Sequence, residues 1–407
     1  RICKETDVKI LIINAGSSSL KYQLTSIDEN KIIAKGLCER IGLAGSALIY
    51  KPTGRDAYEF KKQMNDHTEA MKMVLGALID PTIGVISGME EICAVGHRLV
   101  HGGEKFTGSA LITDEMLATM EELTELAPLH NPANLMGVRA CREIMGDIPM
   151  VGVFDTAFHQ TMPKKAYLYA IPYEAYTQMR IRRYGFHGTS HLYVSERAVA
   201  LLNKPAENTK IITCHLGNGS SIAAVNGGKS VDTTMGFTPL EGLPMGSRCG
   251  DIDPAIVTYL MDKNNWNTSE VCAYLNKQSG MCGLSGVSPD FRDLWVAHNN
   301  GNERATAALE VFCYKVKRYI GAYAAVMNGV DAIVFTAGIG ENDSGVREWV
   351  MKDMEYLGVD FNLDLNRKCP RGKEVELTNP NSRTKVFVIP TDEEMVIARD
   401  TARIAKL

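Results

Sequence analysis

The chain has 407 residues, a length that predicts two or three domains with cores large enough to fold without disulfide or metal support. Lys and Arg number 44 and Asp and Glu number 48, so the formal net charge is −4, which argues against a nucleic-acid coat or a membrane-surface protein. Hydrophobic residues make up 45% and charged residues 23%, which is typical of a folded globular protein and excludes a disordered one.

The cysteines and the apolar runs bear on the cellular compartment. The ten cysteines are scattered and form no C-x-x-C pair, so their spacing indicates neither a zinc site nor a redox motif. No apolar run reaches the roughly 18 residues that a transmembrane helix needs. We therefore expect reduced thiols in a cytoplasmic protein that binds neither nucleic acid nor a membrane.

A strand, loop and strand pattern occurs twice. An apolar run at 8–13 leads into the polar loop 14–19 and a second strand at 20–25, and residues 211–225 repeat this order. The two loop glycines, Gly16 and Gly217, are 201 residues apart, about half the chain. The repeat predicts two related halves, although two Gly/Ser turns can also resemble each other by chance.

Further elements place the chain in the α/β class. Helical spacing of apolar residues predicts helices over 66–79 and 113–126, the second opened by Thr113 as a cap. Buried strands are expected at 150–154, 332–336 and 386–389, with a helix from about Ser344. Strands and helices alternate along the chain, which is the pattern of an α/β protein.

Gly-rich loops follow three of the expected strands. The third loop, 337–342, comes directly after the strand at 332–336. Backbone N–H groups can approach a phosphate closely where no Cβ intervenes, so three such loops favour a nucleotide-binding protein. The P-loop string, the complete dinucleotide fingerprint and the protein-kinase H-R-D signature are all absent, which excludes the familiar nucleotide folds.

Three charged residues follow apolar runs or lie between glycines, where side-chain packing does not explain their presence. Arg98 follows an apolar run, and Arg248 lies in Gly-Ser-Arg-Cys-Gly. A guanidinium is suited to bind a carboxylate or a phosphate, and a surface turn is the alternative for each. Asp155 comes directly after the strand at 150–154, and strand ends are where α/β proteins place their chemistry.

The histidines and the C-terminal acids leave alternatives open. The pairs at 97 and 101 and at 187 and 191 have the i, i+4 spacing of a zinc site, but the Glu of H-E-x-x-H is missing and metal binding is not favoured. His130 breaks a helix, where a buried structural histidine is the alternative. Glu393 and Glu394 either cap the last helix or bind Mg²⁺.

Taken together, these motifs resemble the acetate kinase family of the actin, Hsp70 and sugar-kinase superfamily. The resemblance covers almost the whole chain from about Val8. It rests on NAGSSSLK at 14–21, HRLVHGGEKF at 97–106, LAPLHNP at 126–132, FDTAFHQTMP at 154–163, YGFHGTSH at 184–191, HLGNGSS at 215–221, GFTPLEGLPMGSRCGDIDP at 236–254, FTAGIGEN at 335–342 and PTDEE at 390–394.

The resemblance implies an α/β fold of two duplicated actin-like domains (ribonuclease H-like, βββαβα) that flank an active-site cleft. The first would be 1–155 plus 395–407, because the last helix returns to it, and the second, 156–394, would bind nucleotide and form a homodimer. The implied reaction is the reversible in-line transfer of the ATP γ-phosphoryl group to acetate, giving acetyl phosphate and ADP with Mg²⁺, for which Mn²⁺ is the alternative metal. Acetate ionises at about pH 4–5, so no general base is needed.

The same resemblance implies the site residues. The catalytic groups would be Asp155, Arg98, Arg248, His187 and His130. Acetate would bind to Arg98 and to the apolar residues Val100, Leu129, Phe186 and Pro239. The nucleotide would bind to Ser17, Ser19, Lys21, His215, Gly217, Asn218, Gly219, Asp290, Phe291, Arg292, Gly338, Ile339, Gly340 and Asn342. Asn14 and Glu393 would bind the metal, although Asp392, where many relatives have Asn, leaves the choice between Glu393 and Glu394 open.

Two other functions compete with this interpretation. A propionate or butyrate kinase would use the same fold, but Val100 is bulkier than the Ala of propionate-preferring relatives, which favours acetate. An ATP-binding chaperone or filament protein belongs to the same superfamily, but such proteins do not need the FHGTSH and HGGEKF strings.

Overall fold

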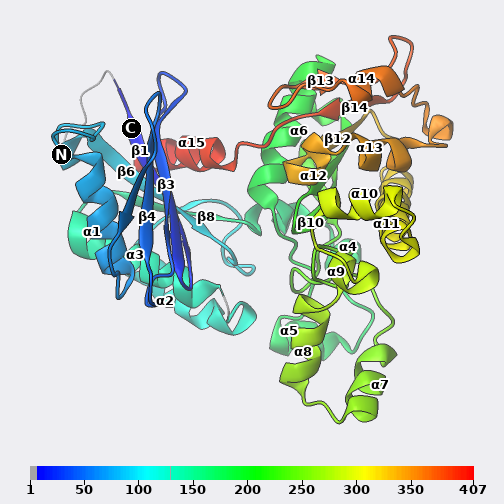
Figure 1. Cartoon of the computed structure of the whole chain (residues 1–407), viewed down its shortest axis with the longest axis horizontal. Coiled ribbons are helices and arrows are strands. Elements are labelled where there is room, and N and C mark those ends of the chain that lie inside the picture. Colours follow the sequence, from blue (N-terminus) through cyan, green and yellow to red (C-terminus); the bar gives the residue numbers. More distant parts are fainter. Residues whose placement is uncertain (1–6, 129) are drawn as a thin grey trace. The chain divides into compact units, whose positions relative to one another are not determined.

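The computed structural model describes residues 7–128 and 130–407. Contacts within the chain divide it into two compact units (Figure 1). Unit 1 comprises Arg1–Ala157 and Asp392–Leu407, so the C-terminal helix belongs with the N-terminal part of the chain. Unit 2 comprises Phe158–Thr391.

Unit 1 is built on an eight-stranded sheet with the order β5-β4-β3-β2-β1-β6-β8-β7. Strands β1 to β5 form an antiparallel meander, and β6 and β8 continue the sheet parallel to β1. The strands are β1 Lys9–Gly16, β2 Ser19–Ser26, β3 Lys31–Glu39, β4 Ala47–Pro52, β5 Tyr58–Lys61, β6 Ile92–Leu99, β7 Ala110–Leu111 and β8 Met150–Phe154. The first predicted loop is thus shorter than expected, because pairing continues to Gly16↔Ser19.

Helices cover both faces of this sheet. Ile10 and Ile12 pack with Ile397 and Ala398 of α15 (Glu393–Ala405), which lies against the sheet in Figure 1. The opposite face contacts α1 (His67–Leu78) and α3 (Asn131–Met145). Asp66 caps α1, and Thr113 caps α2 (Asp114–Glu122) as predicted, but α2 ends earlier than predicted and continues as the 3₁₀ turn η2 (Leu123–Leu126). A further 3₁₀ turn is η1 (Met89–Glu91).

Unit 2 repeats the topology of unit 1. Its sheet has the order β11-β10-β9-β12-β14-β13, in which β9, β10 and β11 form an antiparallel meander and β12 and β14 run parallel to β9. The strands are β9 Lys210–Leu216, β10 Ser220–Asn226, β11 Lys229–Thr233, β12 Ala332–Thr336, β13 Val375–Glu376 and β14 Lys385–Val388. The predicted α/β class with a duplicated pattern is therefore confirmed.

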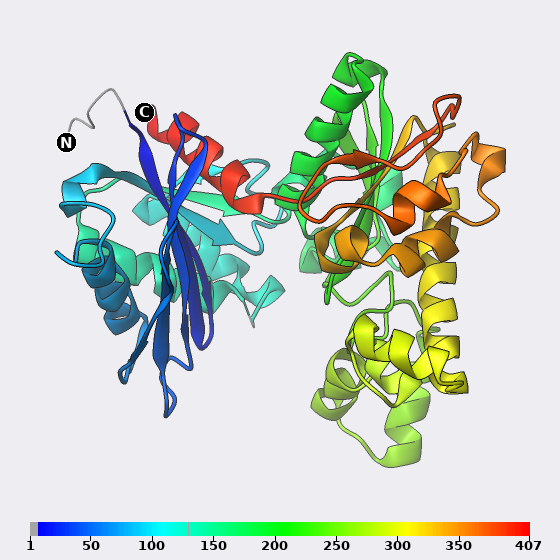
Figure 2. The same cartoon turned by 45° about the horizontal axis from the view of Figure 1, so that its top comes forward.

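The helices of unit 2 also lie on both faces of its sheet. α6 (Gly188–Leu202) packs Val194 and Ala198 on one face, and the long α11 (Glu303–Val326) packs on the other, as Figure 2 shows in green and yellow. The other helices are α4 Lys164–Tyr167, α5 Tyr173–Met179, α7 Ala255–Asn264, α8 Thr268–Lys277, α9 Gly280–Ser285, α10 Phe291–Asn299, α12 Ala337–Asn342, α13 Ser344–Met351 and α14 Leu363–Arg367, with 3₁₀ turns η3 Ala157–Thr161, η4 Ala206–Asn208 and η5 Glu355–Leu357.

Two sequence expectations need correction or completion. The segment expected as the third Gly-rich loop forms the short helix α12, because its backbone turns as soon as β12 ends. The expectation of reduced thiols is wrong at Cys93, which takes part in a disulfide. In the part of the chain that the structure describes, no helix is both long and apolar enough to cross a membrane.

Candidate active site

In unit 1, neighbouring strands bring two of the expected catalytic residues together. Arg98 lies near the end of β6, and Asp155 follows β8, whose Val153 pairs with Arg98. The Nη2 atom of Arg98 donates a hydrogen bond to Oδ2 of Asp155 over 2.5 Å. Arg98 Nε lies 3.8 Å from Oε2 of Glu393, at the start of α15. One guanidinium therefore joins β6, β8 and α15.

Two polar atoms of this ion pair are buried without a hydrogen bond among the described residues. Burial raises the pKa of Asp155 to about 6, against the opposing effect of the Arg98 guanidinium and with a further rise from Glu393. Within the described residues, Asp155 Oδ1 and Arg98 Nε are buried and form no hydrogen bond. Buried polar atoms are almost always paired, so these two mark a place where another polar group can bind.

The expected metal ligands are oxygen donors on the same face of the sheet as α15. Asn14 lines a hollow of 260 Å³ together with Lys21 and Glu394, whereas Glu393 lies beside Arg98. The residue that caps α15 is Asp392, which accepts from the Met395 amide, and not Glu393 or Glu394, for which capping was the alternative. Among the described residues no three His, Cys, Asp or Glu side chains form a metal cluster. One amide and one or two carboxylates fit Mg²⁺, which keeps waters and binds substrate phosphates.

Asn134, a residue that was not predicted from the sequence, connects the expected phosphate-binding loop at 14–19 to Val100 of the expected acetate pocket. Asn134 of α3 accepts from the Val100 amide over 2.9 Å and donates to the Ala15 carbonyl over 2.9 Å. It is 3% exposed, so both bonds are made inside the core. An Asn in a helix carries no local signal for this role, because its partners are 34 and 119 residues away.

The other site residues predicted in unit 1 lie at exposed positions or beside a turn. His130 is exposed at the N-cap position of α3, and its side chain does not cap that helix. Ser17 is exposed in the turn between β1 and β2, and Ser19 begins β2. Leu129 lies outside the described residues.

In unit 2, His187 and Arg248 converge on one glycine. His187 stands in the left-handed conformation (φ +57) before α6, and its ring stacks on that of His215 at 4.1 Å. Arg248 donates from Nη1 to the Pro239 carbonyl over 3.1 Å. A Cβ on Gly219 would lie 3.5 Å from His187 Nε2 and 3.7 Å from Arg248 Nη1. An imidazole and a guanidinium that face the same small space form a site for an anion.

A partly buried ion pair holds the loop that carries Arg248. Arg183 donates from Nη2 to Glu241 over 2.6 Å and from Nη1 to the carbonyls of Thr233 and Thr234 over 3.0 Å. Glu241 also accepts from the Tyr169 hydroxyl. Arg183 and Glu241 were missed by sequence reasoning, because nothing in their neighbours along the chain indicates that they meet.

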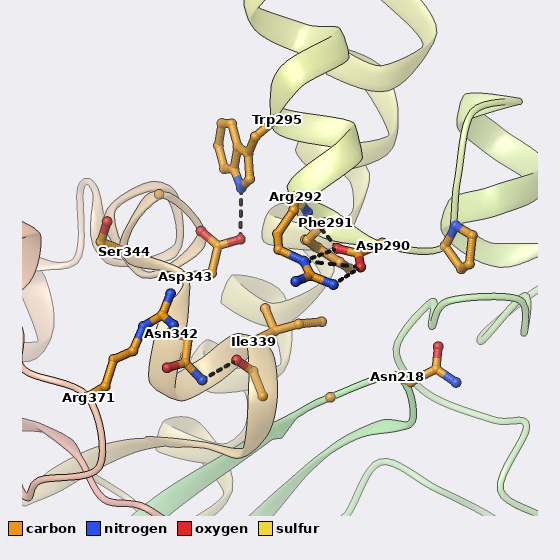
Figure 3. Close-up of a pocket in the computed structure, with 14 residues that line it drawn as sticks. Asn218, Asp290, Phe291, Arg292, Trp295, Ile339, Asn342, Asp343, Ser344 and Arg371 are labelled. Carbon is orange, nitrogen blue, oxygen red and sulfur yellow. Dashed lines mark hydrogen bonds and ion pairs between the residues drawn. The ribbon is translucent and has the colours of Figure 1, made fainter.

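The nucleotide-binding residues expected in unit 2 mostly line one pocket of 860 Å³ (Figure 3). Asp290 pairs with Arg292 on one side, and the Asn342 amide donates to the Gly338 carbonyl on the other, as the dashed lines show. The expected residues in the lining are Gly217, Asn218, Asp290, Phe291, Arg292, Gly338, Ile339 and Asn342.

Some residues of this pocket were not foreseen, and three that were expected do not line it. Trp295, Asp343, Ser344 and Arg371 are additional lining residues, and Trp295 Nε1 donates to Asp343 over 2.8 Å. The expected residues His215, Gly219 and Gly340 lie outside the lining. His215 bonds instead to Ser190, Gly219 lies beside His187 and Arg248, and a Cβ on Gly340 would lie 3.3 Å from the Phe335 backbone.

Comparisons with known proteins show the family to which this chain belongs. The model of the acetokinase family matches residues 9–399. The acetate kinase of Halothermothrix orenii is 58% identical over 399 residues, which are 98% of this chain and 100% of the relative. The acetate kinase of Acetivibrio thermocellus is 55% identical over the same shares of the two chains.

Solved structures of acetate and propionate kinases also match this chain over almost its whole length. The crystal structure of Porphyromonas gingivalis acetate kinase matches with a TM-score of 0.95 at 49% identity, covering 98% of this chain and 99% of the other. A propionate kinase from Francisella tularensis matches with a TM-score of 0.90 at 39% identity, covering 98% and 100%. The family model and these full-length relatives place the chain in the acetokinase family.

Proposed function

We propose that this protein is an acetate kinase, which transfers the γ-phosphoryl group of ATP reversibly to the carboxylate of acetate and forms acetyl phosphate and ADP. The observation that carries the proposal is 58% identity to an acetate kinase over 98% of the chain. The charged residues at the strand ends and the 860 Å³ pocket support it, because they offer cations for an anionic substrate and space for a nucleotide.

The chemistry asks for charge stabilisation and positioning. A carboxylate is an adequate nucleophile at neutral pH, since carboxylic acids ionise at about pH 4–5. The barrier lies in bringing an anion to an anionic phosphate and in stabilising the charge on the transferring group. Cations and N–H donors held in place are therefore the groups that matter.

The residues of unit 1 have the following roles in the proposal. Arg98 binds the acetate carboxylate and a phosphoryl oxygen, and Asp155 holds the guanidinium in place through its 2.5 Å hydrogen bond. Val100 shapes the acyl pocket, to which the resemblance also assigns Leu129, a residue outside the described part of the chain. His130 assists at the acyl site. Ser17, Ser19 and Lys21 approach the phosphates.

The residues of unit 2 act on the transferring group and on the nucleotide. Arg248 and His187 donate to the phosphoryl oxygens, since both face the space at Gly219. Phe186 and Pro239 contribute to the acyl pocket. The nucleotide occupies the pocket between α10 and α12.

Mg²⁺ is the metal that the donor set fits, held by Asn14 with Glu393 or Glu394. When bound, it neutralises charge on the phosphates. Its requirement is tested by titrating Mg²⁺ or Mn²⁺ against the wild type and the Glu393→Gln and Glu394→Gln variants. The variant whose half-saturating metal concentration rises carries the ligand, and unchanged metal dependence in both would exclude the pair.

The activity is tested by measuring ADP formation with acetate while hydroxylamine traps the acyl phosphate. The expected result is hydroxamate formed in proportion to ADP, and no acetate-dependent turnover would refute the proposal. The reverse reaction, ATP from acetyl phosphate and ADP, should also proceed.

Propionate kinase is the second candidate, favoured by the 0.90 TM-score to a propionate kinase. A small apolar pocket distinguishes one methylene by only about 1–3 kcal/mol, so propionate should be a poorer substrate and not an excluded one. The ratio of kcat/KM for acetate, propionate and butyrate decides between them.

Two further properties follow from family membership as proposals. We infer a cytoplasmic homodimer that forms through unit 2, where exposed Tyr259, Tyr314 and Val326 lie on α7 and α11. Sedimentation equilibrium measures this directly, and a monomer at micromolar concentration would contradict it.

A further inference from the structure

Beneath the first turn of α6 lies a buried cluster of hydroxyl and imidazole groups. Thr213 on β9, Ser221 on β10 and His191 on α6 are each 0% exposed. Thr213 pairs with Ala223 and Ser221 with His215 across β9 and β10, so both hydroxyls lie on the face that α6 covers. Farther along the same face the contacts with α6 are apolar, through Val194 and Ala198.

These groups form a continuous series of hydrogen bonds that ends at His187. Thr213 Oγ1 lies 2.7 Å from His191 Nδ1. His191 Nε2 lies 2.8 Å from Ser221 Oγ, and Ser221 Oγ lies 2.9 Å from His187 Nδ1. Every one of these distances is that of a hydrogen bond, and none of the three linking side chains reaches solvent.

The donor-to-acceptor direction of this series of hydrogen bonds follows from Thr213, at the end opposite His187. Among the described residues, His191 Nδ1 is the one hydrogen-bonding partner of the Thr213 hydroxyl. A buried hydroxyl that fails to donate leaves its hydrogen unsatisfied, which is costly, so Thr213 donates and His191 Nδ1 accepts.

The next two links then follow. Burial, with the rings of His159 and His215 nearby, holds the pKa of His191 well below its ordinary value, so this ring is neutral and carries one proton. Because Nδ1 accepts, that proton is on Nε2 and is donated to Ser221. Ser221 accepts from His191, so among the described residues the acceptor for its own hydroxyl proton is the Nδ1 atom of His187.

We propose that Thr213, His191 and Ser221 form a one-way hydrogen-bond relay that sets the ring of His187 in the tautomer with its proton on Nε2. The Nε2 edge faces the space at Gly219 beside Arg248, so the relay presents an N–H donor where the phosphoryl oxygens would lie. The reverse direction would place the proton of a neutral His187 on Nδ1 and turn a lone pair toward those oxygens. This inference rests on the proposed role of His187, and it makes Ser221 and Thr213 positioning residues.

The tautomer can be observed without any turnover. Long-range ¹⁵N–¹H correlation spectra of the ¹⁵N-histidine-labelled full chain distinguish protonated from unprotonated ring nitrogens, with resonances assigned from His187→Gln and His191→Gln. The expected result is Nε2–H on both rings in the wild type, with a mixture of tautomers at His187 in Ser221→Ala. A wild-type His187 protonated on Nδ1 alone would overturn the proposal.

Kinetics provide the second readout. Ser221→Ala should lower kcat about tenfold while the KM values of acetate and MgATP change less than about twofold, because the ring stays in place and only its proton moves. Thr213→Val should lower kcat in the same direction but less, and Thr213→Ser, which keeps the hydroxyl, should restore it. Equal kcat in the wild type, Ser221→Ala and Thr213→Val would refute the relay.

A matched control separates the relay from a loss of folding. Ser195→Ala also removes a buried serine hydroxyl, one that donates to the Leu192 carbonyl within α6, and should leave kcat unchanged. These experiments distinguish failure of the proposed function from failure of the relay. A wild type without acetate-dependent turnover refutes the proposed function and leaves the tautomer assignment standing, whereas normal turnover with the wrong tautomer refutes the relay alone.

Discussion

At the scale of single residues, Arg248 depends on the space that neighbouring glycines leave. Gly280 has φ +62, and a Cβ there would lie 2.1 Å from the Met245 carbonyl oxygen and 2.7 Å from that of Arg248. The backbone of the Arg248 loop can approach α9 this closely only because residue 280 has no side chain.

The first prediction concerns the guanidinium itself. Arg248→Ala should lower kcat by about 100- to 1,000-fold, the usual cost of removing a donor to developing charge. The KM of MgATP should change little, since Arg248 does not line the nucleotide pocket. Steady-state kinetics measure this, and Arg367→Ala, which removes an exposed arginine paired with Glu348, is the control. A kcat near that of the wild type would remove Arg248 from the mechanism.

The second prediction concerns Gly280. Gly280→Ala should reduce the free energy of unfolding by about 1–3 kcal/mol, because the left-handed backbone and the close carbonyls both oppose a side chain. Gly76 lies inside α1 with open space around it, so Gly76→Ala should instead increase stability by about 0.5–1 kcal/mol. Urea unfolding of both variants tests the pair, and the same sign for both would contradict the argument.

At the scale of elements, the 236–251 loop is fixed at two places. Arg183 and Glu241 hold it on one side, and the Tyr319 hydroxyl donates to Asp251 over 2.5 Å on the other. Because Arg248 lies between these anchors, we expect their loss to disturb both stability and chemistry.

Breaking the ion pair gives the third prediction. Arg183→Met leaves the partly buried carboxylate of Glu241 without its cation, so the free energy of unfolding should fall by about 1–3 kcal/mol. The Arg183→Met, Glu241→Met double variant should lose less, since only Asp232, 4.0 Å from Arg183 Nε, is then left without its cation. The exposed pair Arg197–Glu374 is the control, and Arg197→Met should cost about 0–1 kcal/mol. Thermal and urea unfolding measure all of these.

The nucleotide pocket gives the fourth prediction. Trp295→Phe removes the hydrogen bond to Asp343 but keeps an aromatic ring in the wall of the pocket. The KM of ATP should rise by about two- to tenfold, as expected for one lost hydrogen bond, with kcat nearly unchanged. An unchanged KM together with a reduced kcat would place Trp295 outside nucleotide binding.

At the scale of the whole molecule, the same sheet topology occurs twice with different additions. Unit 1 extends its sheet with β4 and β5, whereas unit 2 inserts α7 to α10 between β11 and α11. Both units bury histidines in their cores, which makes the stability of the whole chain sensitive to acid.

The fifth prediction is this pH dependence. Burial lowers the pKa of His159 from 6.5 to about 4 and that of His97 to about 3. The unfolded state therefore binds protons at a higher pH than the folded state, so stability is full above about pH 6.5 and falls as the pH approaches 4. The His159 shift alone corresponds to about 3 kcal/mol.

Urea unfolding at about pH 7.5 and about pH 5 measures this loss. His159→Gln cannot titrate, so it should show a smaller loss of stability over that range than the wild type. His298→Gln, which changes a partly exposed histidine, is the control. An equal loss in the wild type and His159→Gln would contradict the prediction.

Much of this molecule could be predicted from its sequence. The strands β8 and β12 begin and end where the apolar runs do, and Thr113 caps α2, because these signals lie within a few neighbouring residues. The repeat about 201 residues apart predicted the duplication, and the long motifs indicated the family and its reaction. Local patterns and uncommon residue strings are readable without coordinates.

The tertiary structure decided what depends on distant partners. It turned the expected loop at 337–342 into a helix, placed Glu394 with Asn14 at one hollow and added Arg371 to the nucleotide pocket. It also joined Thr213, His191 and Ser221, whose links span 22 and 30 residues. Such contacts depend on how strands and helices pack, because the energy of a buried hydrogen bond comes from the partner in space and not from the neighbour in sequence.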